Sequence, residues 1–183
     1  TGQCVDGAKV GPYREWVPVG PRWVYGASKL AGGRELDPGS AVVRVDAVWG
    51  LRGNNFVKAM RRLANERDTW GVVDDQRHGP SFGPDLAAGI KKLAVARMPG
   101  TFHLSNQGAT TKYGFACAIL AAAGHDPSRV KPLTTATYPT PPARRATPST
   151  DTGHGHPAVF APPAHVARPP RPLFAASGSP CPL

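Results

Sequence analysis

A tyrosine and a lysine four residues apart are the pair in this sequence best suited to chemistry. Tyr25 and Lys29 stand in the run Val-Tyr-Gly-Ala-Ser-Lys, within a segment from Trp23 to Leu36 in which helix formers prevail. In a helix, residues i and i+4 lie on the same face and within reach of each other. The spacing therefore predicts a phenol beside an ammonium group, an arrangement suited to acid–base catalysis.

The ammonium group would make the phenol a better proton donor at neutral pH. An isolated tyrosine has a pKa of about 10. At about 4 Å and an effective dielectric constant of about 20, a lysine charge favours the phenolate by roughly 4 kcal/mol, which would lower that pKa by up to about 3. Such a phenol could protonate a carbonyl oxygen while hydride arrives at the carbon. The same spacing also arises by chance in about one chain in three of this length, on an ordinary exposed helix face.

The elements that must position this pair alternate between short strands and helices, which predicts an α/β domain with parallel strands. The first helix, at 23–36, stops at Asp37-Pro38-Gly39 and precedes a valine-rich strand at 41–45. Asn54 or Asn55 can cap a second helix. Further strands are predicted at 70–73 and 102–104, each followed by a helix, one opening at Pro84 and one spanning 111–123.

The second helix carries apolar residues at helical spacing on one face: Phe56, Val57, Met60, Leu63 and Ala64. The helix that opens at Pro84 carries Leu86, Ile90, Leu93 and Ala94.

Charge and cysteine content argue against several classes of protein. The net charge of +10 is spread along the chain, with doublets such as Arg61-Arg62 as its densest clusters and no nucleic-acid-binding motif. The three cysteines, Cys4, Cys117 and Cys181, form no Cys-x-x-Cys pair, so neither a disulfide framework nor a zinc site is predicted. Without an apolar run long enough for a membrane span or a signal-peptide pattern, we expect a cytoplasmic protein without nucleic-acid or membrane partners.

The C-terminal part has a different composition from the rest. Residues 142–183 contain 10 prolines, no acidic residue after Asp151, and no helical or strand period. Such a segment buries too little apolar surface to offset the entropy of ordering it, so residues 146–183 are predicted to be a disordered tail. His154 and His156 within it are expected to be solvated side chains and not metal ligands.

Six blocks of sequence follow one another in a set order across residues 1–145. They are Val24 to Gly32, Gly53 to Lys58, Val72 to Gln76, Pro84 to Ala87, Gly100 to Asn106, and Thr134 to Pro141. In content, order and spacing, these blocks resemble the dTDP-4-dehydrorhamnose reductases of the extended short-chain dehydrogenase/reductase superfamily. The first block contains Tyr25 and Lys29, so the resemblance favours the chemical interpretation of the pair.

The resemblance implies a Rossmann-like, doubly wound parallel sheet, incomplete here, plus a small α/β substrate-binding part. We expect residues 1–50 to be the catalytic end of a truncated nucleotide-binding domain, residues 51–145 the substrate-binding portion, and residues 146–183 the tail. The glycine-rich turn that cradles the cofactor in such folds is absent from residues 1–183. Because the sequence opens at Thr1 within motif-like text, we expect a piece of a longer reductase.

The activity that the resemblance implies is reduction of the 4-keto group of dTDP-4-dehydro-L-rhamnose to dTDP-L-rhamnose by NADPH or NADH. Tyr25 would donate the proton, Lys29 would also hold the nicotinamide ribose, and Thr1 stands at the family's catalytic Ser/Thr position. The substrate-binding positions that it implies are Thr1, Ala47, Asn54, Asn55 and Arg145. A helix N-terminus at the asparagines could meet the phosphates, and the arginine could pair with the diphosphate. The dTDP-sugar is the expected partner, a homodimer is a possible assembly, and Mg²⁺ is not indicated by the sequence.

Three positions depart from the family's pattern. Gln3 replaces a tyrosine, Ala47 a tryptophan, and Gly33 a glutamate. The departures at Gln3 and Ala47 support a second hypothesis, a non-catalytic fragment or subunit that binds a nucleotide-sugar. A third hypothesis, an epimerase or dehydratase of the same superfamily, is disfavoured by the blocks at 53–56 and 138–141.

Overall fold

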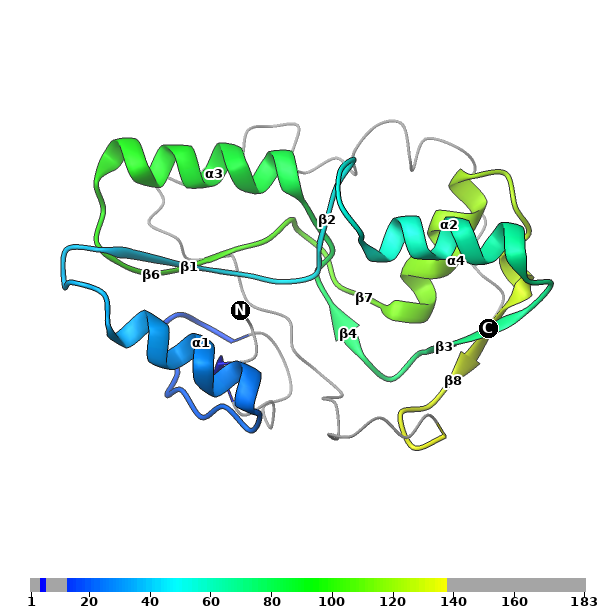
Figure 1. Cartoon of the computed structure of the whole chain (residues 1–183), viewed down its shortest axis with the longest axis horizontal. Coiled ribbons are helices and arrows are strands. Elements are labelled where there is room, and N and C mark those ends of the chain that lie inside the picture. Colours follow the sequence, from blue (N-terminus) through cyan, green and yellow to red (C-terminus); the bar gives the residue numbers. More distant parts are fainter. Residues whose placement is uncertain (1–3, 6–12, 138–183) are drawn as a thin grey trace.

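The computed structural model describes residues 4–5 and 13–137, which form alternating helices and short strands (Figure 1). In chain order the elements are α1 (Val24–Arg34), β1 (Ala41–Val45), β2 (Val48–Trp49), α2 (Phe56–Glu66), β3 (Trp70–Val73), β4 (Arg77–His78), β5 (Ser81–Phe82), α3 (Gly83–Ala96), β6 (Gly100–Leu104), β7 (Thr110–Thr111), α4 (Lys112–Ala122), η2 (Pro127–Arg129) and β8 (Val130–Leu133). The α/β class is confirmed, and each predicted helix and strand is present to within two residues at either end.

The strands of the described residues pair as four two-stranded sheets. β1 runs parallel to β6, from Ala41 opposite Gly100 to Val45 opposite Leu104. β3 runs parallel to β8, and β2 runs parallel to β5. The antiparallel β4–β7 ladder was not predicted, because each of its strands has only two residues and is too short to show a period in the sequence.

Helices α1 and α3 lie on opposite sides of the β1–β6 pair (Figure 1). Gly33 of α1 faces Val42 of β1, with the position of a Cβ at Gly33 3.9 Å from a Val42 methyl carbon. On the other side, a Cβ at Gly89 of α3 would fall 2.8 Å from a methyl carbon of Leu104 in β6. A side chain at position 89 would therefore require the Leu104 side chain to shift.

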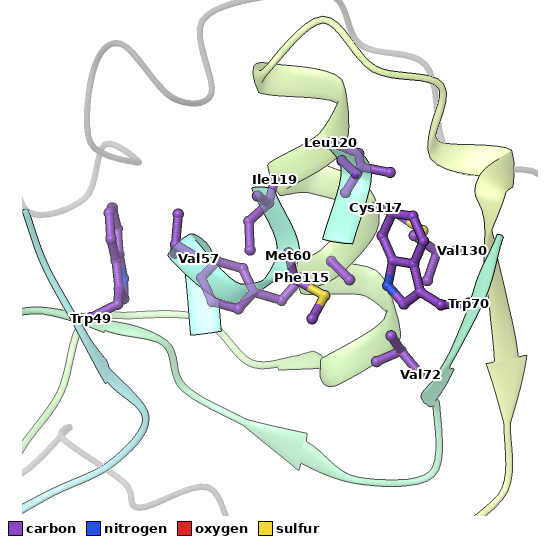
Figure 2. Close-up of a cluster of buried hydrophobic side chains, with 12 residues drawn as sticks. Trp49, Val57, Met60, Trp70, Val72, Phe115, Cys117, Ile119, Leu120 and Val130 are labelled. Carbon is purple, nitrogen blue, oxygen red and sulfur yellow. The ribbon is translucent and has the colours of Figure 1, made fainter. Parts of the chain in front are cut away.

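The larger hydrophobic core lies between α2, α4 and the β3–β8 pair (Figure 2). Its buried members are Trp49, Val57, Met60, Ala64, Trp70, Val72, Phe115, Ala116, Cys117, Ile119, Leu120 and Val130. Phe56 stacks on Phe115 with ring centroids 5.7 Å apart, and Leu63 also packs against this core, so the predicted face of α2 is confirmed. None of the described helices, α4 included, is long and apolar enough to cross a membrane.

The apolar residues of α3 are only partly buried. Leu86 and Leu93 are 6% and 2% exposed, whereas Ile90 is 45% exposed and Ala94 is also exposed. The two described strands beneath α3 cover a narrower stripe of the helix than its apolar residues occupy.

Candidate active site

The first turns of α1 and α3 lie at the same end of the β1–β6 pair as the carboxyl ends of the strands (Figure 1). Because the two strands are parallel, Val45 and Leu104 end at one edge. Each helix runs back along the strands, so Tyr25 of α1 belongs to this edge, as does Ala47 just beyond β1. Ligands of open parallel sheets bind outside the carboxyl ends of the strands, which makes this edge the candidate active site.

Tyr25 and Lys29 lie on one face of α1, as their spacing predicts. The Lys29 Nζ lies 5.5 Å from the centroid of the Tyr25 ring, over its face. Tyr25 is 53% exposed. The nearby Ser28 Oγ donates a hydrogen bond of 2.9 Å to the backbone carbonyl oxygen of Tyr25 and does not contact its phenol. The phenol is thus accessible to a reactant, with a cation held beside its ring.

Few contacts in the described residues hold α1 in place. Gly26 is the buried residue of the 11-residue helix, and Trp23 at its N-cap supplies no capping side chain. The Cys4 Sγ contacts the Gly26 carbonyl oxygen at 3.9 Å. Isolated helices of this length are marginal in water, so the orientation of Tyr25 depends on whatever packs against α1.

Ala47 forms the turn between β1 and β2 in a left-handed conformation, with φ of 39°. This conformation costs a non-glycine residue roughly 1–2 kcal/mol. Two hydrogen bonds hold it: the Ala47 N–H donates to Asp46 Oδ1 at 3.0 Å, and the Ala47 carbonyl accepts from the Ser81 N–H at 3.1 Å. Ser81 is fully buried. The turn is therefore braced by β5 at the end of the strand that leads into the site.

Asn106, just beyond β6, braces the same edge. Its Oδ1 accepts from the Phe82 N–H at 2.6 Å, and its Nδ2 donates to Asp85 Oδ2 at 2.7 Å. One side chain thus joins the loop after β6 to the first turn of α3. Sequence reasoning missed this role, although a polar residue directly after a predicted strand was the signal available.

Asn55 is the N-cap of α2, and its side chain forms hydrogen bonds within the loop and the first turn of the helix. Its Oδ1 accepts from the Lys58 N–H at 3.1 Å, and its Nδ2 donates to the Gly50 carbonyl at 2.8 Å. Asn54 beside it is exposed. Asn54 is the more exposed of the two asparagines predicted to bind substrate, and the side chain of Asn55 orders the loop before α2.

Replacing Asn55 with alanine is expected to lower the free energy of unfolding by about 1–2 kcal/mol, because the cap and the bond to Gly50 are both lost. Asn54→Ala is the matched control and should change it by less than about 0.5 kcal/mol. Urea denaturation of the two variants measures the difference. Equal destabilisation would contradict the assignment of the cap to Asn55.

Three motif residues beyond the site form a polar network with Lys112. The Asp75 carboxylate accepts from the Thr135 N–H at 2.7 Å and from its Oγ1 at 2.6 Å. Gln76 donates to Thr135 Oγ1 at 2.9 Å and accepts from Lys112 Nζ at 2.8 Å. Burial raises the pKa of Asp75, but the hydrogen bonds from Thr135 outweigh it and leave the pKa below its usual value. The blocks at 72–76 and 134–137 therefore share a structural role in tying β3, β8 and α4 together.

His78 is buried on β4, and sequence reasoning did not single it out. Its ring packs edge-on against Phe115, with centroids 6.1 Å apart, and its Nδ1 has no hydrogen-bond partner among the described residues. Burial, with the Lys112 ammonium as a second cause, lowers the pKa of His78 to about 4. The histidine is therefore neutral at physiological pH.

His103 is buried on β6, opposite Arg44 of β1. Its Nδ1 lies 3.0 Å from the Tyr13 carbonyl, and its backbone N–H donates to Glu15 Oε1 at 3.2 Å. Burial lowers the pKa of His103; the Glu15 carboxylate opposes this and the Arg44 guanidinium adds to it. These contacts attach the segment before α1 to the sheet.

Several predicted features lie outside the described residues. They are Thr1, Gln3, Arg144, Arg145, the histidines 154 and 156, Cys181, and the whole predicted tail. Within residues 4–5 and 13–137, no group of three or more His, Cys, Asp or Glu side chains is arranged to hold a metal ion. The structure brings Tyr25, Lys29 and Ala47 to one end of the sheet, and the other predicted site residues remain predictions.

Comparison with known proteins gives consistent matches. The family described as the RmlD substrate binding domain matches residues 1–158. The chain is 40% identical over 142 residues to a dTDP-4-dehydrorhamnose reductase of Streptomyces griseus, a match that covers 73% of this chain and 47% of that protein. With a reductase of the same name from Mycobacterium tuberculosis it shares 39% identity over 143 residues, covering 75% and 47%. The chain spans about half the length of the curated relatives it matches.

Solved structures of dTDP-4-dehydrorhamnose reductases are also similar to this chain. A dTDP-4-dehydrorhamnose reductase of Bacillus anthracis, in complex with NADP, superposes with a TM-score of 0.78 at 34% identity, covering 82% of this chain and 54% of that one. A dTDP-glucose 4,6-dehydratase of Streptomyces venezuelae reaches a TM-score of 0.66 over 82% of this chain and 49% of that one. At 16% identity, that second likeness shows a common fold alone.

Proposed function

Because the chain belongs to the RmlD substrate binding domain family, whose relatives named above are dTDP-4-dehydrorhamnose reductases, we propose that it supplies the catalytic and substrate-binding half of such a reductase. The reaction is reduction of the 4-keto group of dTDP-4-dehydro-L-rhamnose to give dTDP-L-rhamnose. The observation that carries the proposal is the Tyr25–Lys29 pair, which lies on one accessible helix face at the carboxyl edge of parallel strands.

Tyr25 is the proton donor in this proposal. Its Oη protonates the substrate's 4-keto oxygen while hydride reaches the carbon, so the carbonyl becomes a hydroxyl and the phenol becomes a phenolate. The Lys29 ammonium, already over the Tyr25 ring, stabilises the negative charge that develops there. Water or the lysine then returns a proton to the phenolate. Thr1, at the family's Ser/Thr position, would orient the same carbonyl.

The residues present fit one end of a nicotinamide cofactor. Lys29 is exposed and close enough to the Tyr25 ring to hold a ribose hydroxyl beside the phenol. A bound NADPH or NADH supplies the hydride. No glycine-rich turn for its diphosphate occurs in residues 1–183, so the rest of the cofactor needs further protein. The NADP complex of the Bacillus anthracis relative supports a phosphorylated nicotinamide cofactor for this family fold.

Substrate recognition is assigned to the end of β1 and the start of α2. Ala47, Asn54 and the N-terminus of α2 capped by Asn55 would face the nucleotide-sugar, and helix N-termini suit phosphate oxygens. Arg145 would pair with the diphosphate. The small side chain of Ala47 leaves more room at the strand end than the tryptophan that the family pattern has there.

The test is an assay of the chain alone and of the chain joined, as one polypeptide, to the part of the Streptomyces griseus reductase that the match does not cover. Loss of the absorbance of NADPH or NADH is followed with dTDP-4-dehydro-L-rhamnose as substrate. Turnover by the joined protein supports the proposal. A joined protein that is folded and binds cofactor, but gives no turnover, contradicts it.

A second candidate is a non-catalytic module that binds a nucleotide-sugar. The residues at positions 3 and 47, a glutamine and an alanine in place of the family's tyrosine and tryptophan, favour it. It predicts that dTDP binds to the chain alone, measurable by calorimetry, while the joined protein gives no turnover. The two candidates are thus separated by the same pair of proteins.

A further inference from the structure

His103 is a polar side chain buried on the face of the β1–β6 pair that α1 covers. Its neighbour in β6, Leu104, lies against Gly89 of α3, and successive side chains of a strand point to opposite faces of the sheet. Because α1 and α3 lie on opposite sides of this pair, His103 faces the α1 side (Figure 1). The residue is only 3% exposed. Burying a polar ring there costs free energy unless the ring is hydrogen-bonded.

The ring of His103 is hydrogen-bonded to the chain segment that precedes α1. Its Nδ1 lies 3.0 Å from the backbone carbonyl oxygen of Tyr13. A carbonyl oxygen can only accept, so Nδ1 carries the hydrogen and Nε2 is the acceptor nitrogen of a neutral ring. Burial lowers the pKa of His103, which favours this neutral form. Nε2 has no partner among the described residues, so the bond to Tyr13 is what orients the ring within them.

The backbone of His103 holds the same segment at a second point. Its N–H donates to Glu15 Oε1 at 3.2 Å. Tyr13 itself is 2% exposed, so this part of the segment is packed into the protein. The Val17 N–H then donates to the Arg14 carbonyl at 3.2 Å, which closes a turn directly after the attachment. One residue of β6 therefore fixes the chain on both sides of Arg14.

The N-terminal half of α1, which carries Tyr25, depends on this segment for its position. The segment continues through Gly20, whose N–H donates to the Cys4 carbonyl at 3.0 Å, and the Cys4 Sγ contacts the Gly26 carbonyl at 3.9 Å. It ends at Trp23, the N-cap of α1, which supplies no capping side chain. A helix of 11 residues is marginally stable alone, so a shift of the segment would shift Tyr25 with it.

We propose that His103 is a positioning residue for the catalytic helix: its two hydrogen bonds to the segment before α1 hold the Tyr25 phenol in place at the carboxyl end of β1. Because His103 is buried, it acts through α1 and not on the substrate. A proton donor must lie within hydrogen-bond reach of the reacting oxygen, and a misplacement of about 1 Å costs up to about 10²-fold in rate. The effect on turnover rests on the proposed function, whereas the anchoring of α1 does not.

The first test is amide hydrogen exchange of the full chain, which needs neither cofactor nor substrate. His103→Leu removes the ring N–H and leaves an apolar side chain, so the amides of α1 should exchange at least about tenfold faster while those of α4 change less than about threefold. His78→Leu is the matched control, because it makes the same substitution at a buried histidine that packs against Phe115 of α4. It should accelerate α4 more than α1. Unchanged exchange of α1 in His103→Leu, or equal acceleration of both helices in both variants, would overturn the proposal.

Milder variants keep the test valid if leucine at position 103 prevents folding. In His103→Asn the side-chain amide can donate from about the place of Nδ1, so exchange of α1 should stay within about threefold of the unaltered chain. Glu15→Ala removes the acceptor of the His103 N–H from a half-buried position and should accelerate α1 at least about threefold. Glu15→Gln keeps an acceptor oxygen and should not. An alanine variant that behaves as the glutamine variant does would refute the anchoring.

The second test is the steady-state kinetics of the joined reductase. His103→Leu should lower kcat at least about tenfold and change KM for dTDP-4-dehydro-L-rhamnose less than about threefold, because it displaces the proton donor and not the substrate-binding loops. His103→Asn should restore most of kcat, and His78→Leu should retain it. Equal loss of kcat in the two leucine variants, or an effect on KM alone, would contradict a positioning role. If the unaltered joined protein gives no turnover, the proposed function fails, and the exchange measurements still decide whether His103 anchors α1.

Discussion

Tyr25→Phe is expected to lower the turnover number of the joined reductase roughly 10²–10⁴-fold, the range that a positioned general acid contributes. The substitution removes the phenolic hydroxyl and keeps the ring that lies beneath Lys29 Nζ. Tyr25 is 53% exposed, so the free energy of unfolding should change little. Steady-state kinetics with reduced nicotinamide cofactor and dTDP-4-dehydro-L-rhamnose measure the effect, and the loss should fall on kcat more than on KM.

Tyr113→Phe is the matched control for that experiment. It removes the same hydroxyl from a tyrosine that packs against the core of α2 and α4. Most of the turnover should remain. A Tyr25→Phe protein with unaltered kcat, or a loss of equal size in both variants, would exclude Tyr25 as the proton donor.

The regular elements could be predicted because their signals are local. The valine run at 41–45 and the apolar spacing of Val57, Met60 and Ala64 each lie within one element, and both correspond to observed structure. The β4–β7 ladder joins Arg77 to Thr111, and its two-residue strands are too short to show a period from which the pairing could be predicted. The exposure of Ile90 also could not be foreseen, because it depends on the number of strands beneath α3.

In the candidate site, too, some features could be predicted from the sequence and others could not. The proximity of Tyr25 and Lys29 follows from helix spacing, and a capping asparagine follows from its place before an apolar helix, although the choice of Asn55 over Asn54 comes from the structure. The brace by Asn106 and the burial of His78 arise from contacts between residues distant in sequence, which spacing does not encode. The left-handed turn at Ala47 also could not be predicted, because alanine, unlike glycine or asparagine, does not favour positive φ.

The buried histidines make the stability of the chain depend on pH. In the unfolded chain His78 titrates near 6.5, whereas in the folded protein burial and Lys112 lower its pKa to about 4. Between these values the unfolded chain binds a proton that the folded protein does not, so stability falls as pH falls through this window. Burial also lowers the pKa of His103, which acts in the same direction.

His78→Gln should therefore flatten the pH dependence of the free energy of unfolding. We expect the unaltered chain to lose on the order of 3 kcal/mol through His78 alone between pH 7 and pH 4. The variant begins less stable at pH 7, because a buried ring packed on Phe115 is lost, but it lacks this loss on acidification. Urea denaturation at several pH values gives the difference between the two proteins. A difference that does not change between pH 7 and pH 4 would show that His78 is not the titrating group, and His103→Gln would then be the variant in which the acid sensitivity disappears.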